Sequence, residues 1–582
     1  MRPELLAVRA VNQYRCRDIL AYLGLRYYLS NDCAKKDSWA KDISTYLVKT
    51  REAPVYFRSH HFKEMAENNV DVVYRNIYLP GPNEVLAEAA LLYGCSSEPI
   101  FQSLKCVYSY RFPEPSSREG VFKAYFPGYQ ERNSSIAQIC SNLDGTHKVV
   151  RYTDIKKFYL SITFELALQA WRDACGLSNL SIAFRELGEQ LLTQYNETST
   201  VNSEGRGLLT GPMFSHLLAN LVLVKVDKLM FQHMEGRYWR YVDDFVLVGS
   251  SNQVEAGRRL LHSILSDMGF SLHDERKDFE VESNTWLQSL TDFDVSKSKI
   301  WTNLIVNVKR FLITKPEKRS ILQNAFSEAG INIPVIDYSS VVAEIPYRDK
   351  FFNWLVRYSW ASNSLRLLTV DKLVQDALQV RKVYWQEINN LLGKDSDVRG
   401  YARKQLISKL RFFAMRLSYL ATPDNLSLLS SALMNYPELY LQSKVMDAIR
   451  SRDVSLLIKF GSNAVQAAAQ ILRIKDDVVR CSLSSFGEVE LQGLAILRLN
   501  GLEIEFLENR EEQYISDPLN QFALGINSRE LMKSSQLFIR ELACLRGIDS
   551  ESISKSILDS AFDTDEQLSF DIIDQLQASS YF

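Results

Sequence analysis

The spacing of apolar and polar side chains changes along the chain, with strand and helix patterns mixed before about residue 350 and helix patterns dominant after it. Short runs of β-forming residues predict strands, and apolar residues at helical spacing predict helices. Strands are predicted over residues 72–80, 106–112, 121–126, 148–154, 238–242, 245–248 and 270–273, and within 285–314, including 300–308. Helices are predicted within residues 1–50 and over 84–93, 164–175, 181–195, 212–225 and 253–268. This mixture indicates an α+β fold for the first half.

The second half reads as a succession of short amphipathic helices separated by polar turns. They are predicted over residues 365–393, 399–420, 425–435, 438–450, 453–459, 462–473, 487–498, 528–546 and 551–562. Consecutive helices of this kind, with weak similarity to one another, are typical of a helical solenoid. We therefore expect an all-α helical-repeat domain of the HEAT-like kind.

Composition places this chain of 582 residues among ordinary soluble globular proteins, since 46% of its residues are hydrophobic and 24% are charged. The length allows two or three domains. We expect no membrane span, because no signal-peptide pattern follows Met1 and no run of about 18 apolar residues occurs. The eight cysteines are scattered without metal-ligand spacing, which fits reduced thiols and a cytoplasmic location.

The net charge of −2 argues mildly against a large, non-specific nucleic-acid surface, although it leaves room for a local basic channel. Two basic pairs, Lys404 with Arg411 and Lys409 with Arg416, have a spacing that places each pair on one side of a helix. They could line such a channel, but a solvated helix face is the simpler explanation.

Two adjacent carboxylates, Asp243 and Asp244, lie between the predicted strands 238–242 and 245–248. A two-residue connection between such runs predicts a hairpin, and aspartate tolerates the turn conformation. The hairpin would present both acids at its tip, where they suit a hard cation such as Mg²⁺. An ordinary Asp-Asp turn is the alternative for this pair taken alone.

Further chemistry lies upstream of the hairpin. Asp154 ends a predicted strand, and a carboxylate there is costly unless it binds something. Tyr159 follows five residues later. A Gly-Pro-Met-Phe-Ser motif from Gly211 to Ser215 then leads into an apolar helix, in which helix propensity does not explain Asn220.

Taken in order, these features resemble the palm of reverse transcriptases, especially the bacterial retron, group II intron and Abi-type phage-defence enzymes. The matching pieces are Thr-Asp-Ile-Lys-Lys-Phe-Tyr at 153–159, Gly-Pro-Met-Phe-Ser-His-Leu-Leu-Ala-Asn-Leu at 211–221 and Tyr-Val-Asp-Asp at 241–244. Met-Gly-Phe-Ser-Leu-His at 268–273 with Lys277 matches the unit that follows in that family. The resemblance covers residues 148–280.

The resemblance implies nucleotidyl transfer with two metal ions. Asp154, Asp243 and Asp244 would hold two Mg²⁺ ions, for which Mn²⁺ is a possible substitute. One ion would activate the attacking hydroxyl, and the other would steady the triphosphate and the leaving pyrophosphate. Lys277 would donate a proton or a charge to the pyrophosphate, with a solvated surface lysine as the alternative.

The resemblance also implies a set of nucleotide-binding residues. Tyr159, preceded by Phe158, would be the steric gate that excludes a ribose 2′-hydroxyl and favours dNTPs; a core aromatic is the alternative. Gly211 would let the backbone approach the incoming nucleotide. Ser215 and Asn220 would orient the sugar or the strand, although Ser215 could also be an ordinary hydroxyl in the first turn of a helix.

The implied fold class is a right-hand polymerase with α+β fingers and palm, followed by the helical-repeat domain in place of a thumb. The expected division is 1–147 for the N-terminal helix and fingers, 148–314 for the palm, 315–364 for a connecting region and 365–582 for the helical repeats. The chain departs from the family in its fingers, where no triphosphate clamp is recognisable. Candidates for binding the triphosphate there are Arg75, Arg111, Lys123 and Arg132, with solvated charges as the alternative.

A palm fused to helical repeats resembles the Abi-type and other defence-associated reverse transcriptases. This implies antiphage defence, dNTP substrates, a DNA product that can be attached to the protein, and a homo-oligomer. A tyrosine hydroxyl can take the place of a primer 3′-hydroxyl, and Tyr14 and Tyr581 are the candidates, with packing as the alternative. Two other hypotheses stay open: a templated reverse transcriptase that copies a dedicated non-coding RNA, and a helical-repeat interaction protein with a vestigial palm.

Overall fold

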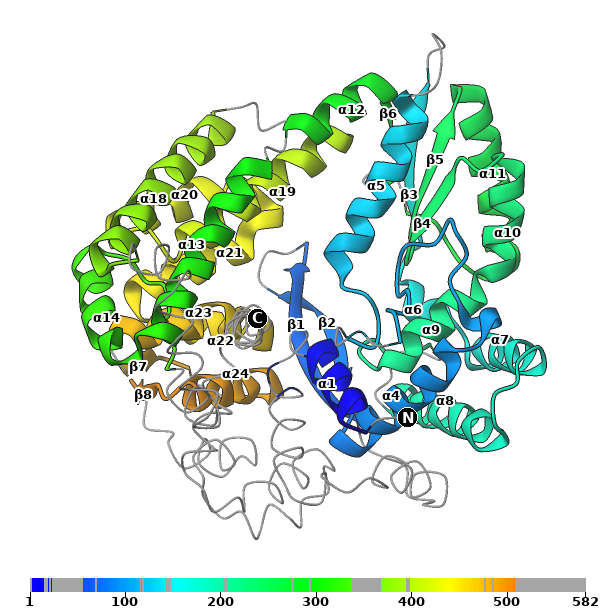
Figure 1. The fold of residues 1–582 in the computed structure, drawn as a ribbon, viewed down its shortest axis with the longest axis horizontal. Helices are drawn as coiled ribbons and strands as arrows, with labels where there is room; N and C mark the ends of the chain where they lie inside the picture. Colours follow the sequence, from blue (N-terminus) through cyan, green and yellow to red (C-terminus); the bar gives the residue numbers. More distant parts are fainter. Residues whose placement is uncertain are drawn as a thin grey trace, which may run out of the picture.

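A computed structural model shows a mixed α+β protein that is mostly helical. It describes residues 3–14, 19, 22, 56–67, 71–115, 117, 120–141, 148–201, 207–273, 277–292, 295–337, 368–393, 398–475, 478–483 and 486–507. Figure 1 shows a sheet with its helices on one side of the molecule and a group of packed helices on the other. None of the described helices has the length and apolar character that crossing a membrane requires.

The first half mixes helices and strands, as the sequence predicted. Its helices include α1 (Pro3–Tyr14), α4 (Pro82–Ser96), α5 (Tyr125–Ser141), α6 (Phe158–Ser161), α7 (Phe164–Gly176), α8 (Ile182–Val201), α9 (Met213–Val222), α10 (Val224–His233), α11 (Ser251–Asp267), α12 (Ser283–Asp292), α13 (Val295–Thr314) and α14 (Arg319–Glu328). Its strands include β1 (Phe57–Met65), β2 (Val72–Leu79), β3 (Val149–Asp154), β4 (Tyr238–Tyr241), β5 (Asp244–Gly249) and β6 (Phe279–Glu282).

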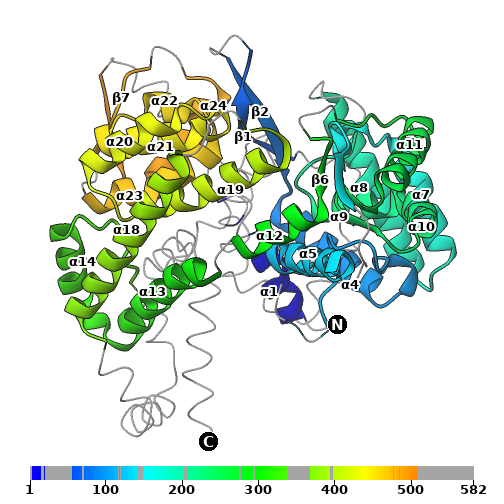
Figure 2. The same ribbon diagram turned by 90° about the horizontal axis from the view of Figure 1, so that it is seen from above.

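Strands β4, β5, β3 and β6 form, in that order, a sheet in which each neighbouring pair is antiparallel; we call it the central sheet. Alternation along β5 gives the sheet two apolar faces. Leu247 lies on the face covered by α10 and α11. Val246 lies on the other face, with Ile136 of α5 and Trp286 of α12. The sheet is therefore buried on both sides (Figures 1 and 2).

Several predicted strands are wrong. Residues 106–112 form a loop that contributes one bridge to β4, because Tyr110 takes a left-handed φ of 51° that a strand excludes. Residues 121–126 run into helix α5, and 270–273 make a single bridge to Ile155.

The stretch 300–308 is part of helix α13. Its buried residues Leu304 and Val308, followed by Phe311, recur at helical spacing. Here the periodicity of the apolar residues outweighs their β propensity.

The second half matches the predicted run of helices as far as it is described, and helices 528–546 and 551–562 lie outside the described residues. It contains α18 (Val370–Leu392), α19 (Gly400–Leu417), α20 (Pro423–Leu433), α21 (Tyr440–Ser451), α22 (Ser455–Ile458), α23 (Ser462–Lys475) and α24 (Glu488–Leu499). Helix α18 packs on α19, α20 on α21, and α23 on α24. A short parallel pair, β7 (Val478–Cys481) with β8 (Glu503–Phe506), was not predicted.

The antiparallel hairpin β1–β2 joins the two halves (Figures 1 and 2), since it packs on α23 and α24. His61 forms a β-bridge with Gly461, and the hydroxyls of Ser59 and Ser462 lie 2.7 Å apart. Gln492 Nε2 donates to the Arg58 carbonyl at 2.7 Å. The hairpin belongs to the first half in sequence but is held by the last described helices.

Three residues of the two basic pairs on α19 make contacts within the fold. Lys404 Nζ lies 4.6 Å from the ring centre of Tyr152, and Arg411 donates to the Glu438 carbonyl at 3.0 Å. The Arg416 guanidinium lies 3.6 Å from the ring centre of Phe412. These contacts favour packing roles over a nucleic-acid channel.

Candidate active site at one end of the central sheet

Three carboxylates meet at one end of the central sheet. In the register of β3 with β5, Asp154 pairs with Asp244, and the Ile155 N–H donates to the Asp243 carbonyl at 3.2 Å. Residues far apart in sequence are thus neighbours at one end of two adjacent strands. We call Asp154, Asp243 and Asp244 the acid site; the structure brings these predicted residues together.

The connection between β4 and β5 lies one residue earlier than predicted, at Val242 and Asp243, while Asp244 already belongs to β5. Val242 has a left-handed φ of 58°, which is costly for a β-branched side chain. Its N–H donates to Ser109 Oγ at 2.9 Å, and its carbonyl accepts from Arg240 Nη1 at 2.8 Å. Both hydrogen bonds hold the strained residue that precedes Asp243.

A buried network stands behind this turn. Arg240 donates through Nε and Nη2 to Asp227 at 2.8 and 2.7 Å, and both side chains are 1% exposed. Arg240 Nη1 also donates to Asn220 Oδ1 at 3.1 Å, and Asn220 Nδ2 donates to the Ser109 carbonyl at 3.1 Å. Asn220 therefore supports the turn from within the fold, which differs from the predicted contact with sugar or strand.

Asp243 and Asp154 of the acid site have different electrostatic surroundings. Burial, and then the neighbouring charge of Asp154, raises the pKa of Asp243 to about 7. Lys277 Nζ lies 2.7 Å from Asp154 Oδ2, so the predicted lysine does reach the acid site. The buried Asp154 Oδ1 has no hydrogen-bond partner among the described residues.

The third acid has a partner that the sequence did not predict. Arg132 of α5 donates from Nη1 to Asp244 Oδ2 at 3.0 Å, and its side chain is 0% exposed. The guanidinium also lies 4.4 Å from the ring centre of Tyr129. Arg132, suggested from the sequence as a triphosphate-binding residue, thus lies buried with Nη1 on Asp244, while its Nε and Nη2 have no hydrogen-bond partner among the described residues. Arg111, another candidate, pairs with Glu131 at 3.2 Å.

The three acids do not form a complete ligand set as they stand. Within the described residues, no group of three or more His, Cys, Asp and Glu side chains is arranged to hold a metal ion. Asp154 and Asp243 alone do fit a cation, since the first has a buried oxygen without a partner and the second resists ionisation beside its neighbour. A hard cation would compensate both effects.

Tyr159 lies on the short helix α6, half-buried, and points its hydroxyl at α9. The hydroxyl lies 2.5 Å from His216 Nδ1 and 3.4 Å from the Tyr110 hydroxyl. The His216 ring stacks on the Tyr110 ring, with centres 4.1 Å apart and planes at 6°. Phe158 is buried and packs on Phe270, so its side chain lies in the core.

Gly211 is needed for a contact inside the fold. Its φ is +130°, and a Cβ there would lie 2.2 Å from the Tyr78 carbonyl oxygen of β2. The backbone that approaches Gly211 is therefore that of Tyr78. Ser215 is fully buried, and its Oγ has no hydrogen-bond partner among the described residues. The structure thus places Ser215 inside the fold, in the first turn of α9.

The start of α9 is fixed by Glu88 of α4, which sequence reasoning missed. Its Oε2 accepts from the N–H groups of Met213 and Phe214 at 2.7 and 3.3 Å, and its Oε1 accepts from the Tyr195 hydroxyl at 2.7 Å. Burial raises the pKa of Glu88 to about 7. This carboxylate anchors the helix that carries Ser215, His216 and Asn220.

No model of a known protein family matches this chain, and no curated protein is found to be similar to it. The comparisons therefore show no family for this chain, and the resemblance to reverse transcriptases stays a prediction from the sequence motifs.

Only one of the two candidate priming tyrosines, Tyr14, lies among the described residues. Tyr14 ends helix α1, and its side chain is 0% exposed within the core. Its hydroxyl would have to leave this position before it could attack a nucleotide. Tyr581 lies outside the described residues.

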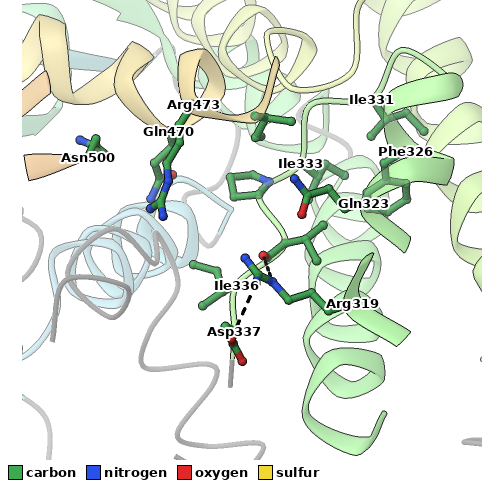
Figure 3. Close-up of a pocket in the computed structure, with 13 residues that line it drawn as sticks. Arg319, Gln323, Phe326, Ile331, Ile333, Ile336, Asp337, Gln470, Arg473 and Asn500 are labelled. Atoms are coloured by element: carbon green, nitrogen blue, oxygen red, sulfur yellow. Dashed lines mark hydrogen bonds and ion pairs between the residues drawn. The ribbon is translucent and has the colours of Figure 1, made fainter. Parts of the chain in front are cut away.

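A separate cavity of about 230 Å³ lies between the two halves, where α14 and residues 331–337 meet α23 (Figure 3). Arg319 donates to the Val335 carbonyl at 3.0 Å, and its guanidinium lies 3.6 Å from Asp337. These charged groups are engaged with the cavity wall and with each other. The cavity therefore offers a weaker basis for chemistry than the acid site.

Proposed function

We propose that this chain is a metal-dependent nucleotidyltransferase of the reverse transcriptase type that makes DNA from dNTPs. The observation that supports this function most is the juxtaposition of Asp154 and Asp243 at one sheet end, with Lys277 in contact with Asp154. Carboxylates from two strands and a nearby cationic side chain suit the transfer of a nucleotidyl group from a triphosphate.

Each residue of the site has a proposed part. Asp154 and Asp243 would hold Mg²⁺, or Mn²⁺ in its place, and the ions when bound would supply Lewis-acid activation of the attacking hydroxyl. Arg132 keeps Asp244 in a fixed position beside them. Lys277 is more than half exposed, so it can turn from Asp154 toward a leaving pyrophosphate. Tyr159 would contact the sugar of the incoming dNTP.

We also propose the finer fold assignment that goes with this function. The central sheet and its helices correspond to a polymerase palm, the β1–β2 hairpin to part of the fingers, and the helices after residue 368 to a HEAT-like array in place of a thumb. The succession of neighbouring helix contacts supports the array. A cytoplasmic antiphage role, a homo-oligomer and a product attached to the protein are proposed from the sequence resemblance.

The proposal is tested with purified full-length protein, labelled dNTPs, and Mg²⁺ or Mn²⁺, with and without a primed RNA template. Products are separated on a denaturing gel before and after proteolysis. Asp243→Asn and Asp154→Asn are each expected to lower incorporation by about 10³-fold or more, since each removes an anionic ligand. Asp267→Asn, an exposed acid at the end of α11, is the matched control and should behave as the wild type.

The outcomes separate the hypotheses. Label that migrates with the protein until proteolysis supports protein priming. Incorporation that needs an added or co-purified RNA supports a templated enzyme. Absence of incorporation under every condition, or equal activity of the Asp243→Asn variant and the wild type, would refute the proposed function and favour an interaction protein.

A further inference from the structure

The hydroxyl of Tyr159 makes a polar contact that has no part in the reaction proposed above. His216 Nδ1 lies 2.5 Å from it, and the two rings meet edge to face with centres 5.5 Å apart. His216 is 4% exposed, so this hydrogen bond is shielded from water. A shielded hydrogen bond between two side chains fixes their relative orientation more firmly than one at the surface.

His216 is itself held in place. Its ring stacks flat on Tyr110, whose ring meets Phe122 edge to face with centres 5.5 Å apart. The histidine lies one turn into α9, and Glu88 fixes the first N–H groups of that helix. The Tyr159 hydroxyl is thus connected to a rigid part of the fold, whereas the ring itself lies on α6, a helix of one turn.

A ring that excludes a single hydroxyl group must be fixed to within a fraction of an ångström. If the ring could swing about its χ1 and χ2 torsions, a ribose would displace it at little cost. Position, and not ring size alone, therefore sets the discrimination.

We propose that His216 is a specificity-determining residue: by holding the Tyr159 hydroxyl, it fixes the Tyr159 ring where a ribose 2′-hydroxyl would lie. This inference rests on the proposed function, because it needs a chain that incorporates nucleotides. His216 acts through Tyr159 and is a positioning residue. The ligand class that it selects is the 2′-deoxynucleoside triphosphate.

The experiment measures kcat/KM for a dNTP and for the matching rNTP, and takes their ratio. The variants are Tyr159→Phe, which removes the hydroxyl and keeps the ring, His216→Phe, which keeps an aromatic ring and removes the nitrogen, and the double variant. His216→Asn restores a polar group near the position of Nδ1. His262→Phe, the same change at an exposed position of α11, is the control.

Each single variant is expected to lower the dNTP-to-rNTP ratio by about tenfold, the size of one shielded hydrogen bond. The double variant should lower it no further, because both changes remove the same contact. His216→Asn should recover most of the ratio, and His262→Phe should leave it unchanged. A general loss of folding would lower kcat/KM for the dNTP and the rNTP by the same factor and would leave their ratio unchanged.

Two results would overturn the inference. If the wild type incorporates dNTPs and the single variants keep its ratio, His216 does not set specificity although the proposed function stands. Multiplicative losses in the double variant would likewise show that the two residues act separately. If the wild type incorporates neither substrate, the proposed function and this inference fail together.

Discussion

The two halves of the molecule bury different kinds of polar side chain. Up to residue 337, the buried side chains include the charged Glu88, Arg132, Asp227, Arg240 and Asp278. Among the described residues from 368 onward, the buried polar side chains are serine, glutamine and asparagine only. Burial of a charge is costly unless a partner compensates it. The buried charges of the first half therefore need partners at fixed positions, as Arg240 has in Asp227, whereas the described part of the second half buries only neutral polar groups.

A pair of interactions illustrates the difference. In the first half, Arg240 and Asp227 form a fully buried ion pair that holds the turn at Val242. In the second half, α20 and α21 are joined by the hydroxyls of Ser430 and Ser443, 2.9 Å apart. Loss of one member leaves a buried charge without a partner in the first pair, but only an unpaired hydroxyl in the second. The following changes test this contrast in order of expected effect.

Replacement of Arg240 by leucine should destabilise the protein most, by about 3–5 kcal/mol, because Asp227 would be left buried without a cation. Denaturant unfolding measures the loss. Arg172→Leu, which removes an exposed ion pair with Glu189, is the control and should change the midpoint much less. The double variant Arg240→Leu/Asp227→Leu should recover part of the stability. Equal losses in Arg240→Leu and Arg172→Leu would contradict the comparison.

Glu88 should make stability depend on pH. Its pKa is raised by burial to about 7 in the folded protein, from a value near 4.5 when unfolded. The folded state therefore binds the proton more tightly, so this group's contribution to stability falls as pH rises from about 4.5 through 7. Glu88→Gln should match the wild type near pH 5 and gain relative to it by pH 8. Thermal unfolding across this range checks the trend, and a difference that does not vary with pH would disprove it.

The junction between the halves should be sensitive at Gly461. Its φ is +90°, and a Cβ would lie 2.1 Å from the His60 carbonyl oxygen. Gly461→Ala should therefore cost about 1–3 kcal/mol and loosen the β1–β2 hairpin. Amide hydrogen exchange of residues 57–65 would report the loosening. Gly176→Ala, where a Cβ meets nothing within 4 Å, is the control. If residues 57–65 exchange their amide hydrogens as slowly in Gly461→Ala as in the wild type, the predicted loosening of the hairpin is wrong.

Ser430→Ala should have the smallest effect. Its hydroxyl contacts the Ser443 hydroxyl and the carboxylate of Asp447, which is 36% exposed, and loss of such a partly solvated hydroxyl contact costs about 0.5–1.5 kcal/mol. Denaturant unfolding under the conditions used for Arg240→Leu allows a direct comparison. A loss as large as that of Arg240→Leu would show that the second half also depends on its buried polar groups.

The sequence predicted those features that carry a local signal. Strands β3, β4 and β5, the acids at their ends, and Lys277 follow from runs of β-formers and from motif spacing. The partners of these residues could not be predicted. Arg132 and Glu88 act across more than 100 positions of sequence, and nothing near either residue marks its target. Asn220 was recognised as unusual in its helix, but its contact with Arg240 depends on the fold.

The hairpin contact has a consequence for how the chain is made. Ser59 and Ser462 are 403 positions apart, yet their side chains touch. As a ribosome releases the chain from its N-terminus, the central sheet can assemble well before residue 462 emerges. We therefore expect β1 to dock on α23 and α24 only after the central sheet has formed. Until α23 and α24 are translated, Phe62 on the hairpin lacks the ring of Phe460, on which it packs in the folded protein.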